Sequence, residues 1–259
     1  EEISKNTLVV QYNNSEELAS LLEKHKDVAG VIVEPVLANM GLILPEKNFL
    51  FELRKITNQH DVPLIFDEVV TGFRLSPGGA QEYYGINPDL TTLGKALGNG
   101  FVIAAVGGKK KIMDILVPNG KVYQASTYAG NPISVSAAIS SIRSMNKNKR
   151  KLYSKLERHC KFLSNAVDDT ATDLRIPHQI NSLGSMFQIF FTNKPVTDYR
   201  SSKKADTKKF KNLFVSLLKN EVFVAPSQYE TVFLSDAHTN SDLNKAIIAY
   251  DKALKRVKS

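Results

Sequence analysis

Short apolar runs alternate with amphipathic segments through the first half of this chain, and this alternation constrains the fold more than any other feature. The run VAGVIVEP at 28–35 is rich in β-branched residues and apolar on both faces, as in a strand buried between layers of helices. Similar runs stand at 7–12, 62–68 and 88–95. The segments between them have helical periodicity, so the order predicts an α/β domain with a largely parallel sheet.

Helix signals separate these predicted strands. Asn14, with Glu17 three residues later, can cap a helix over 15–26. Pro45 and Glu46 open another segment whose apolar positions recur at helical spacing. Both helices are therefore expected to pack on the sheet.

The second half of the chain has a different pattern. We expect four helices: one that starts near residue 131, two over 149–167 and 203–220, and a last one that begins after Thr239. Strand-like segments stand at 183–191 and 222–224. Asp242 lies three residues after Thr239 and can complete the cap of that last helix. This pattern predicts a larger domain over 1–147 and a smaller α+β domain over 148–259.

Composition excludes several classes of protein. The chain has 34 basic and 26 acidic residues, a net charge of +8, but its lysine clusters lack the interleaved aromatic residues that stack on bases. A solvated basic surface is the favoured interpretation, and no nucleic-acid partner is expected. No run approaches the roughly 20 apolar residues of a membrane span. With the single cysteine Cys160 and no leader-like start, we expect a cytoplasmic protein without a membrane partner.

Polar residues follow two of the predicted strands. Asp67 and Glu68 come after PLIF, and Lys95 follows DLTTLG, 95 − 67 = 28 residues later. In a parallel sheet ligands bind beyond the carboxyl ends of the strands. There, a lysine can form a Schiff base with an aldehyde cofactor, and a carboxylate can keep a pyridine nitrogen protonated. Spacing alone leaves two plainer alternatives open, namely an aspartate that caps a loop and a lysine in solvent.

Three ordered motifs extend this interpretation. The segments IFDEVVTGFR (65–74), PDLTTLGKALGNG (88–100) and YQASTYAGNP (123–132) together resemble class III aminotransferases. The likeness also includes VIVEPVLANMG (31–41) and APSQYE (225–230). Within that class the motifs are most similar to the glutamate-1-semialdehyde 2,1-aminomutase family. The resemblance implies the α/β fold type I of pyridoxal-phosphate enzymes, with part of the large-domain sheet in 1–147.

The resemblance also implies roles for three residues at the sheet edge. Lys95 would carry the Schiff base with pyridoxal 5'-phosphate and move the proton during amino transfer. Asp67 would bind the pyridine nitrogen, and Val69 would pack on the ring. These three roles are those of the residues at the same motif positions in the family.

Three further residues are implied by the same likeness. Thr127 would donate to the cofactor phosphate of the other subunit, and Tyr123 would approach the site from that subunit, in a homodimer with shared sites. Glu230 would lie near the substrate amine. The five histidines show no metal-ligand spacing, and we expect no metal.

The implied reaction is an intramolecular amino transfer that converts glutamate 1-semialdehyde to 5-aminolevulinate in tetrapyrrole biosynthesis, starting from pyridoxamine 5'-phosphate. Glu230 and Gln124 favour it over a class III ω-aminotransferase with a separate donor, whereas Ser126 and the loop 98–108 depart from the aminomutase pattern. A non-catalytic truncated partner subunit is the other alternative. The family's phosphate turn, stacking aromatic and substrate-carboxylate arginine are not in this sequence, so we expect a C-terminal fragment.

Overall fold

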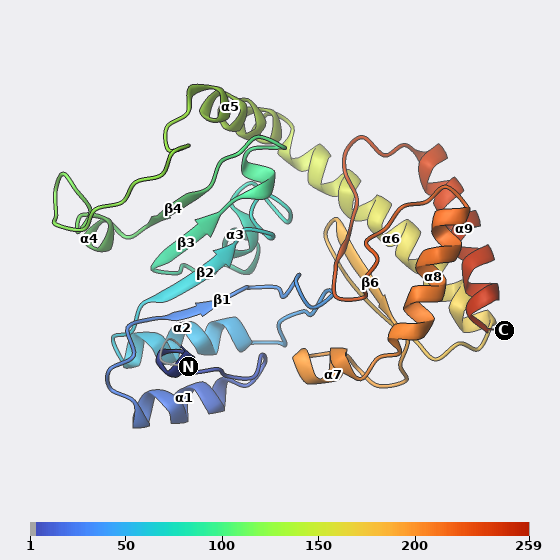
Figure 1. Cartoon of the computed structure of the whole chain (residues 1–259), viewed down its shortest axis with the longest axis horizontal. Helices are drawn as coiled ribbons and strands as arrows, with labels where there is room; N and C mark the ends of the chain where they lie inside the picture. The colour runs from blue at the N-terminus through green and yellow to red at the C-terminus, as the bar shows by residue number, and fades with distance from the viewer. Residues whose placement is uncertain (1–3, 259) are drawn as a thin grey trace.

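A four-stranded sheet forms the centre of the first half, in the order β1-β2-β3-β4. Its strands are β1 (Val31–Val33), β2 (Leu64–Glu68), β3 (Leu90–Leu93) and β4 (Ala105–Gly108). The first three are parallel and β4 is antiparallel to β3. The computed structural model describes residues 4–258, and Figure 1 shows this sheet on the left of the molecule. The α/β class predicted from the sequence is confirmed.

Helices precede, connect and follow the strands of this sheet. They are η1 (Ser4–Asn6), α1 (Ser15–Lys24), α2 (Phe49–Gln59), α3 (Gly79–Tyr84), η2 (Lys95–Leu97), α4 (Lys110–Met113) and α5 (Pro132–Lys147). The Glu17 N–H donates to Asn14 Oδ1 at 3.0 Å, so the predicted cap of α1 is confirmed. The second helix begins at Phe49, later than Pro45, because Asn48 adopts a left-handed backbone conformation with φ of 72°.

The strand predicted at 7–12 is not formed. Leu8 and Val9 lie exposed in a segment that has no ladder partner among the described residues. Tyr12 is buried and donates its hydroxyl to Pro35 O at 2.8 Å. The apolar run therefore packs through one anchor residue, while its backbone lacks the cross-strand hydrogen bonds that define a strand.

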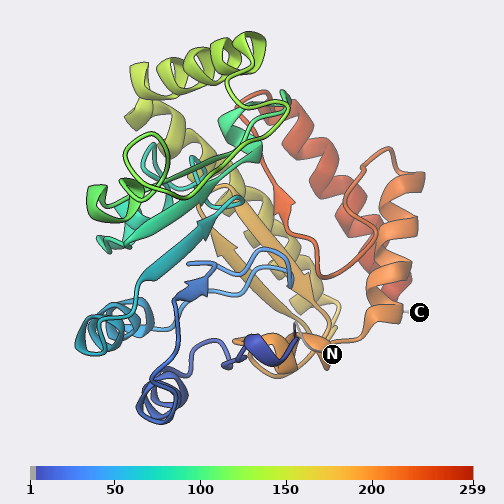
Figure 2. The same ribbon diagram turned by 60° about the vertical axis from the view of Figure 1, so that its left-hand side comes forward.

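The second half contains an antiparallel sheet covered by long helices (Figure 2). Its elements are α6 (Lys149–Asp173), β5 (Gln179–Leu183), β6 (Met186–Phe190), α7 (Tyr199–Lys203), α8 (Thr207–Lys219), β7 (Val232–Phe233) and α9 (Asn240–Lys258). The predicted strand at 222–224 is wrong, because Val222 N donates to Leu217 O and ends α8. The third strand is β7 instead. The cap of α9 is confirmed, with the Asp242 N–H donating to Thr239 Oγ1.

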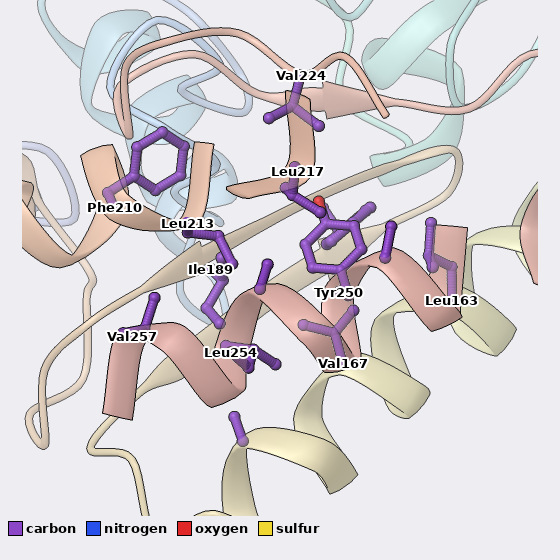
Figure 3. Packing of buried hydrophobic residues seen from close by; sticks show 14 of the residues in the cluster. Leu163, Val167, Ile189, Phe210, Leu213, Leu217, Val224, Tyr250, Leu254 and Val257 are labelled. Carbon is purple, nitrogen blue, oxygen red and sulfur yellow. The ribbon is translucent and has the colours of Figure 1, made fainter. Parts of the chain in front are cut away.

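Leucine, valine and aromatic side chains from α6, α8, α9 and β6 form the core of the second half (Figure 3). The labelled residues point toward one another from these four elements and from the segment after α8. Phe187 and Leu217 have no solvent exposure. Burial of each such side chain contributes about 1.5–3 kcal/mol, so this cluster holds the helices on the sheet.

The two halves meet through apolar side chains. Phe190 of β6 packs in one cluster with Leu18 and Phe49 of the first half. Between the halves, α5 ends at Lys147 and α6 begins at Lys149. The domain ranges 1–147 and 148–259 remain a prediction, and their ends at 1–3 and 259 lie outside the described residues.

Candidate active site

The carboxyl edge of the parallel strands brings together polar side chains from three neighbouring strands. Val33 pairs with Phe66, and Asp67 pairs with Thr92, so Glu34 and Asp67 follow adjacent positions of β1 and β2. Asp67 Oδ1 accepts the Thr92 hydroxyl at 3.0 Å and the Val69 N–H at 3.1 Å. These two donors fix the orientation of the carboxylate, and its second oxygen has no hydrogen-bond partner within residues 4–258.

Glu34 is the charged neighbour of both residues predicted from the sequence. Its carboxylate accepts the Ala38 N–H and the Asn39 amide, each at 3.1 Å. Burial raises the pKa of Glu34, the Asp67 charge adds to that rise, and the Lys95 charge opposes it. Glu34 therefore lies within electrostatic reach of both Asp67 and Lys95.

Lys95 begins the short helix η2, one residue after β3 ends. Its φ is 44°, a left-handed conformation that costs a non-glycine residue about 1–2 kcal/mol. Its side chain is exposed and has no hydrogen-bond or ion-pair partner in the described part of the chain. Strained backbone of this kind clusters at functional sites, because the surrounding fold must hold it in place.

Val69 lies beside the turn that carries Lys95. A Cβ atom added at Gly94 would lie 3.4 Å from Val69 Cγ1, so the absence of a side chain at Gly94 leaves space there. Val69 is half-buried and reaches this turn from β2. The strand ends thus place a carboxylate, an aliphatic side chain and an amine at one edge of the sheet.

Glu68 has a structural role on the other face of β2. It is fully buried and accepts the Thr71 hydroxyl at 3.2 Å, the Ala80 N–H at 2.6 Å, the Gln81 N–H at 3.0 Å and the Gln81 amide at 3.1 Å. This carboxylate therefore anchors the start of α3 to the sheet.

Glu230 comes from the second half. Gln188, which is fully buried, donates its amide to the carbonyl oxygens of Gln228, at 2.9 Å, and of Glu230. The Glu230 side chain itself is exposed. The next residue, Thr231, hydrogen-bonds to Ala38 O and Gly41 O, so the Glu230 segment is attached to the loop that follows Glu34.

Tyr123 and Thr127 stand apart from this edge. Both are exposed on the loop between α4 and α5, and no hydrogen bond joins either of them to Asp67 or Lys95 within the described residues. The loop ends at Asn131, whose side chain accepts the Ile133 and Ser134 N–H groups and caps α5. Thr127 and Tyr123 are thus presented on the surface of this chain.

The residues at the edge fit the cofactor that the motifs imply. A pyridine nitrogen needs a carboxylate with a free oxygen, and Asp67 Oδ2 offers one. An aldehyde needs a nearby amine without a competing partner, and Lys95 provides it. A separate cavity of about 640 Å³ beside α1, α2 and β1 is lined by none of the expected site residues.

No metal site and no membrane span are found in the described residues. Within residues 4–258, no three histidine, cysteine, aspartate or glutamate side chains come together as a metal ion requires. No helix in that range has both the length and the apolar character needed to cross a membrane.

The α/β sheet, with polar residues at the carboxyl edge of its parallel strands, has the arrangement of the fold type I class of aminotransferase-like enzymes. The class-III aminotransferase family matches residues 3–247. The chain belongs to this family.

Similar proteins of known name agree with that assignment. The chain is 70% identical over 259 residues to the glutamate-1-semialdehyde 2,1-aminomutase of Nitrosopumilus maritimus (strain SCM1), covering 100% of this chain and 61% of that protein. It is 54% identical to glutamate-1-semialdehyde 2,1-aminomutase 1 of Cenarchaeum symbiosum (strain A), covering 97% of this chain and 59% of that protein. The chain thus spans about three fifths of the length of these curated relatives.

Solved structures share the fold. An ω-transaminase from Sphaerobacter thermophilus superposes with a TM-score of 0.88 at 28% identity, over 96% of this chain and 57% of that one. A glutamate-1-semialdehyde aminomutase from Pseudomonas aeruginosa PAO1, in complex with PMP, gives a TM-score of 0.85 at 24% identity, over 97% of this chain and 57% of that one. The second likeness supports the fold alone.

Glu34 is the residue that strand-end reasoning missed. It follows VIV as Asp67 follows LIF, and the sequence shows the same pattern at both places. Only the strand register reveals that the two carboxylates are neighbours.

Proposed function

We propose that the protein to which this chain belongs converts glutamate 1-semialdehyde to 5-aminolevulinate by internal amino transfer, in tetrapyrrole biosynthesis. Pyridoxal or pyridoxamine 5'-phosphate would be the cofactor, held by Asp67, Val69 and Lys95. The observation that carries the proposal is the strand-edge arrangement of Asp67 and Lys95 in a chain 70% identical to a named aminomutase.

Each residue at the edge has a definite task in this proposal. The cofactor, when bound, supplies an aldehyde that takes up amines and a ring that withdraws electrons. Asp67 would accept a hydrogen bond from the ring nitrogen, and the Thr92 hydroxyl and Val69 N–H keep its carboxylate in position. Lys95 would hold the aldehyde form of the cofactor, and in the pyridoxamine form its free amine would carry the proton to and from the substrate carbon.

Glu230 supports an aminomutase over an aminotransferase with a separate donor. A dicarboxylate donor requires positive groups for both carboxylates, whereas a substrate that supplies its own second amine suits an acidic residue. Glu230 is exposed on the segment that Thr231 attaches to the loop after Glu34, and its carboxylate is free to meet an amine. We assign it the role of holding that amine.

A second copy of the chain would complete the arrangement. Large apolar side chains are exposed between β3 and the middle of α5, and they include Phe101, Val102, Val106, Tyr123 and Tyr128. Exposed apolar patches mark interaction sites. We propose a cytoplasmic homodimer in which the loop with Thr127 and Tyr123 reaches the partner's cofactor site.

Conversion without an added amino donor tests this function. Full-length protein loaded with pyridoxamine 5'-phosphate should form 5-aminolevulinate from glutamate 1-semialdehyde through many turnovers, with no amino acid or keto acid added. A need for a donor in every cycle would indicate an ω-aminotransferase. Absence of cofactor binding by the full-length protein would indicate a non-catalytic subunit.

A further inference from the structure

The backbone around Glu230 is held by buried side chains on both sides. Gln188 donates to the carbonyl oxygens of Gln228 and Glu230, and the Glu230 N–H donates to Ser227 O at 3.1 Å. Thr231 is only 5% exposed. The Glu230 side chain is therefore an exposed group on a segment with little freedom to move.

Thr231 fastens this segment to the first half of the chain. Its Oγ1 lies 2.9 Å from Ala38 O and 2.7 Å from Gly41 O, and both oxygens belong to the loop between β1 and α2. The Gly41 N–H donates to Tyr229 O at 2.7 Å. A Cβ at Gly41 would lie 2.9 Å from Gln228 O, so the two segments approach as closely as their backbones allow.

The other end of the same loop is attached to the strand edge. Glu34 binds the Ala38 N–H and the Asn39 amide, and it lies within electrostatic reach of Asp67 and Lys95. Ala38 is thus held by Glu34 through its N–H and by Thr231 through its carbonyl oxygen. One short loop connects the Lys95 edge with the Glu230 segment.

We propose that Thr231 is a positioning residue, whose hydroxyl sets the distance from the Glu230 carboxylate to the Lys95 edge through the loop 34–41. The inference rests on the proposed function, because it takes Glu230 to hold the substrate amine. A misplacement of about 1 Å in such a site lowers rates by up to about a hundredfold. Removal of the hydroxyl leaves the shape of the segment intact and deletes its bond to the loop.

Thr231→Val and Thr231→Ser form the matched pair that tests this role in cofactor-loaded, full-length protein. Thr231→Val should lower kcat/KM for glutamate 1-semialdehyde about tenfold, because a misplaced carboxylate loses orientation. Thr231→Ser should retain wild-type kcat/KM. Glu230→Gln should lower kcat/KM as well, and Thr231→Val should then add less than about twofold in the Glu230→Gln background, because contacting residues are not additive.

Asn13→Asp is the control for general loss of contact between the halves. Asn13 Nδ2 donates to Leu44 O at 3.1 Å and to Thr197 O at 2.7 Å, away from Glu230. This variant should lower the melting temperature, and its effect on kcat/KM, if any, should multiply with that of Glu230→Gln.

A second measurement keeps the inference separate from the proposed function. The pH midpoint of the cofactor's visible absorbance, recorded without substrate, should shift in the same direction in Thr231→Val and Glu230→Gln and stay unchanged in Asn13→Asp. If wild-type protein does not convert the substrate, the proposed function fails and this midpoint still decides the inference. Multiplicative effects of Thr231→Val and Glu230→Gln, or a midpoint that only one of them moves, would overturn it.

Discussion

Gly79→Ala tests how the sheet and α3 are held together beneath the site. Gly79 has φ of +73°, and a Cβ there would lie 2.8 Å from Glu68 Cδ, 2.9 Å from Oε1 and closer still to Oε2. Glu68 is fully buried and fixed by four hydrogen bonds, so its carboxylate cannot move away from the new Cβ without breaking one of them.

The cost of this substitution has two parts. A left-handed alanine costs about 1–2 kcal/mol relative to glycine. Displacement of the carboxylate breaks at least one buried hydrogen bond to a charged group, which costs about 1.5–3 kcal/mol. We expect Gly79→Ala to lower the free energy of unfolding by about 2.5–5 kcal/mol.

Gly85→Ala provides the matched control. Gly85 has φ of +67° at the other end of α3, but apart from its own chain neighbours no atom of the described residues lies within 4 Å of its added Cβ. It should therefore cost only the backbone part, about 1–2 kcal/mol. Urea denaturation of the full-length variants, followed by circular dichroism, measures both. Equal losses at the two positions would refute the reasoning, because the clash with Glu68 would then carry no energy.

Two other predictions follow from shifted ionisation. Burial raises the pKa of Asp89, but hydrogen bonds from Lys109, the Leu64 N–H and Arg54 outweigh it and hold the pKa below its usual value. The ionised Asp89 therefore stabilises the fold above its unfolded pKa of about 3.9, and this stability is lost as pH falls through the lower folded pKa. Asp89→Asn should make the melting temperature fall less steeply below about pH 4. An unchanged slope of melting temperature against pH would contradict this. Burial raises the pKa of Cys160 to about 11, so its thiol should react little with a maleimide at neutral pH. Peptide mapping should find Cys160 unlabelled in the folded protein and labelled after unfolding. Labelling in the folded protein would contradict this prediction.

Local signals predicted the elements whose own residues decide their structure. Asn14 and Thr239 cap α1 and α9 through side chains that lie within three residues of their partners. The apolar run before Asp67 forms β2, whose positions alternate between buried and half-buried. Such elements depend little on distant parts of the chain.

The errors concern strands, whose hydrogen bonds come from elsewhere in the sequence. Residues 7–12 are apolar enough for a strand but have no strand to pair with among residues 4–258. Residues 222–224 follow α8, and Val222 N donates to Leu217 O of that helix. β5 was missed because its residues QINSL are only half-buried and show little apolar alternation. Strand pairing depends on tertiary context, which local sequence does not contain.

The site residues also fall into two groups, those that local sequence identifies and those that only tertiary contacts reveal. Asp67 and Lys95 stand at strand ends that the sequence identifies, and the register brings them to one edge. Glu34 and Thr231 depend on contacts across the fold, with Thr231 bonded to a residue 193 positions away. Thr127 and Tyr123 do not join the edge within one copy of the chain, and their roles stay predictions.

Covalent trapping at Lys95 tests the central claim most directly. Borohydride reduction of full-length protein loaded with pyridoxal 5'-phosphate, followed by peptide mapping, should place the reduced cofactor on the peptide that contains Lys95. The Lys95→Arg variant should keep its fold and lose the label. A label on another lysine, or a label that persists in Lys95→Arg, would contradict the assignment of the strand edge as the cofactor site.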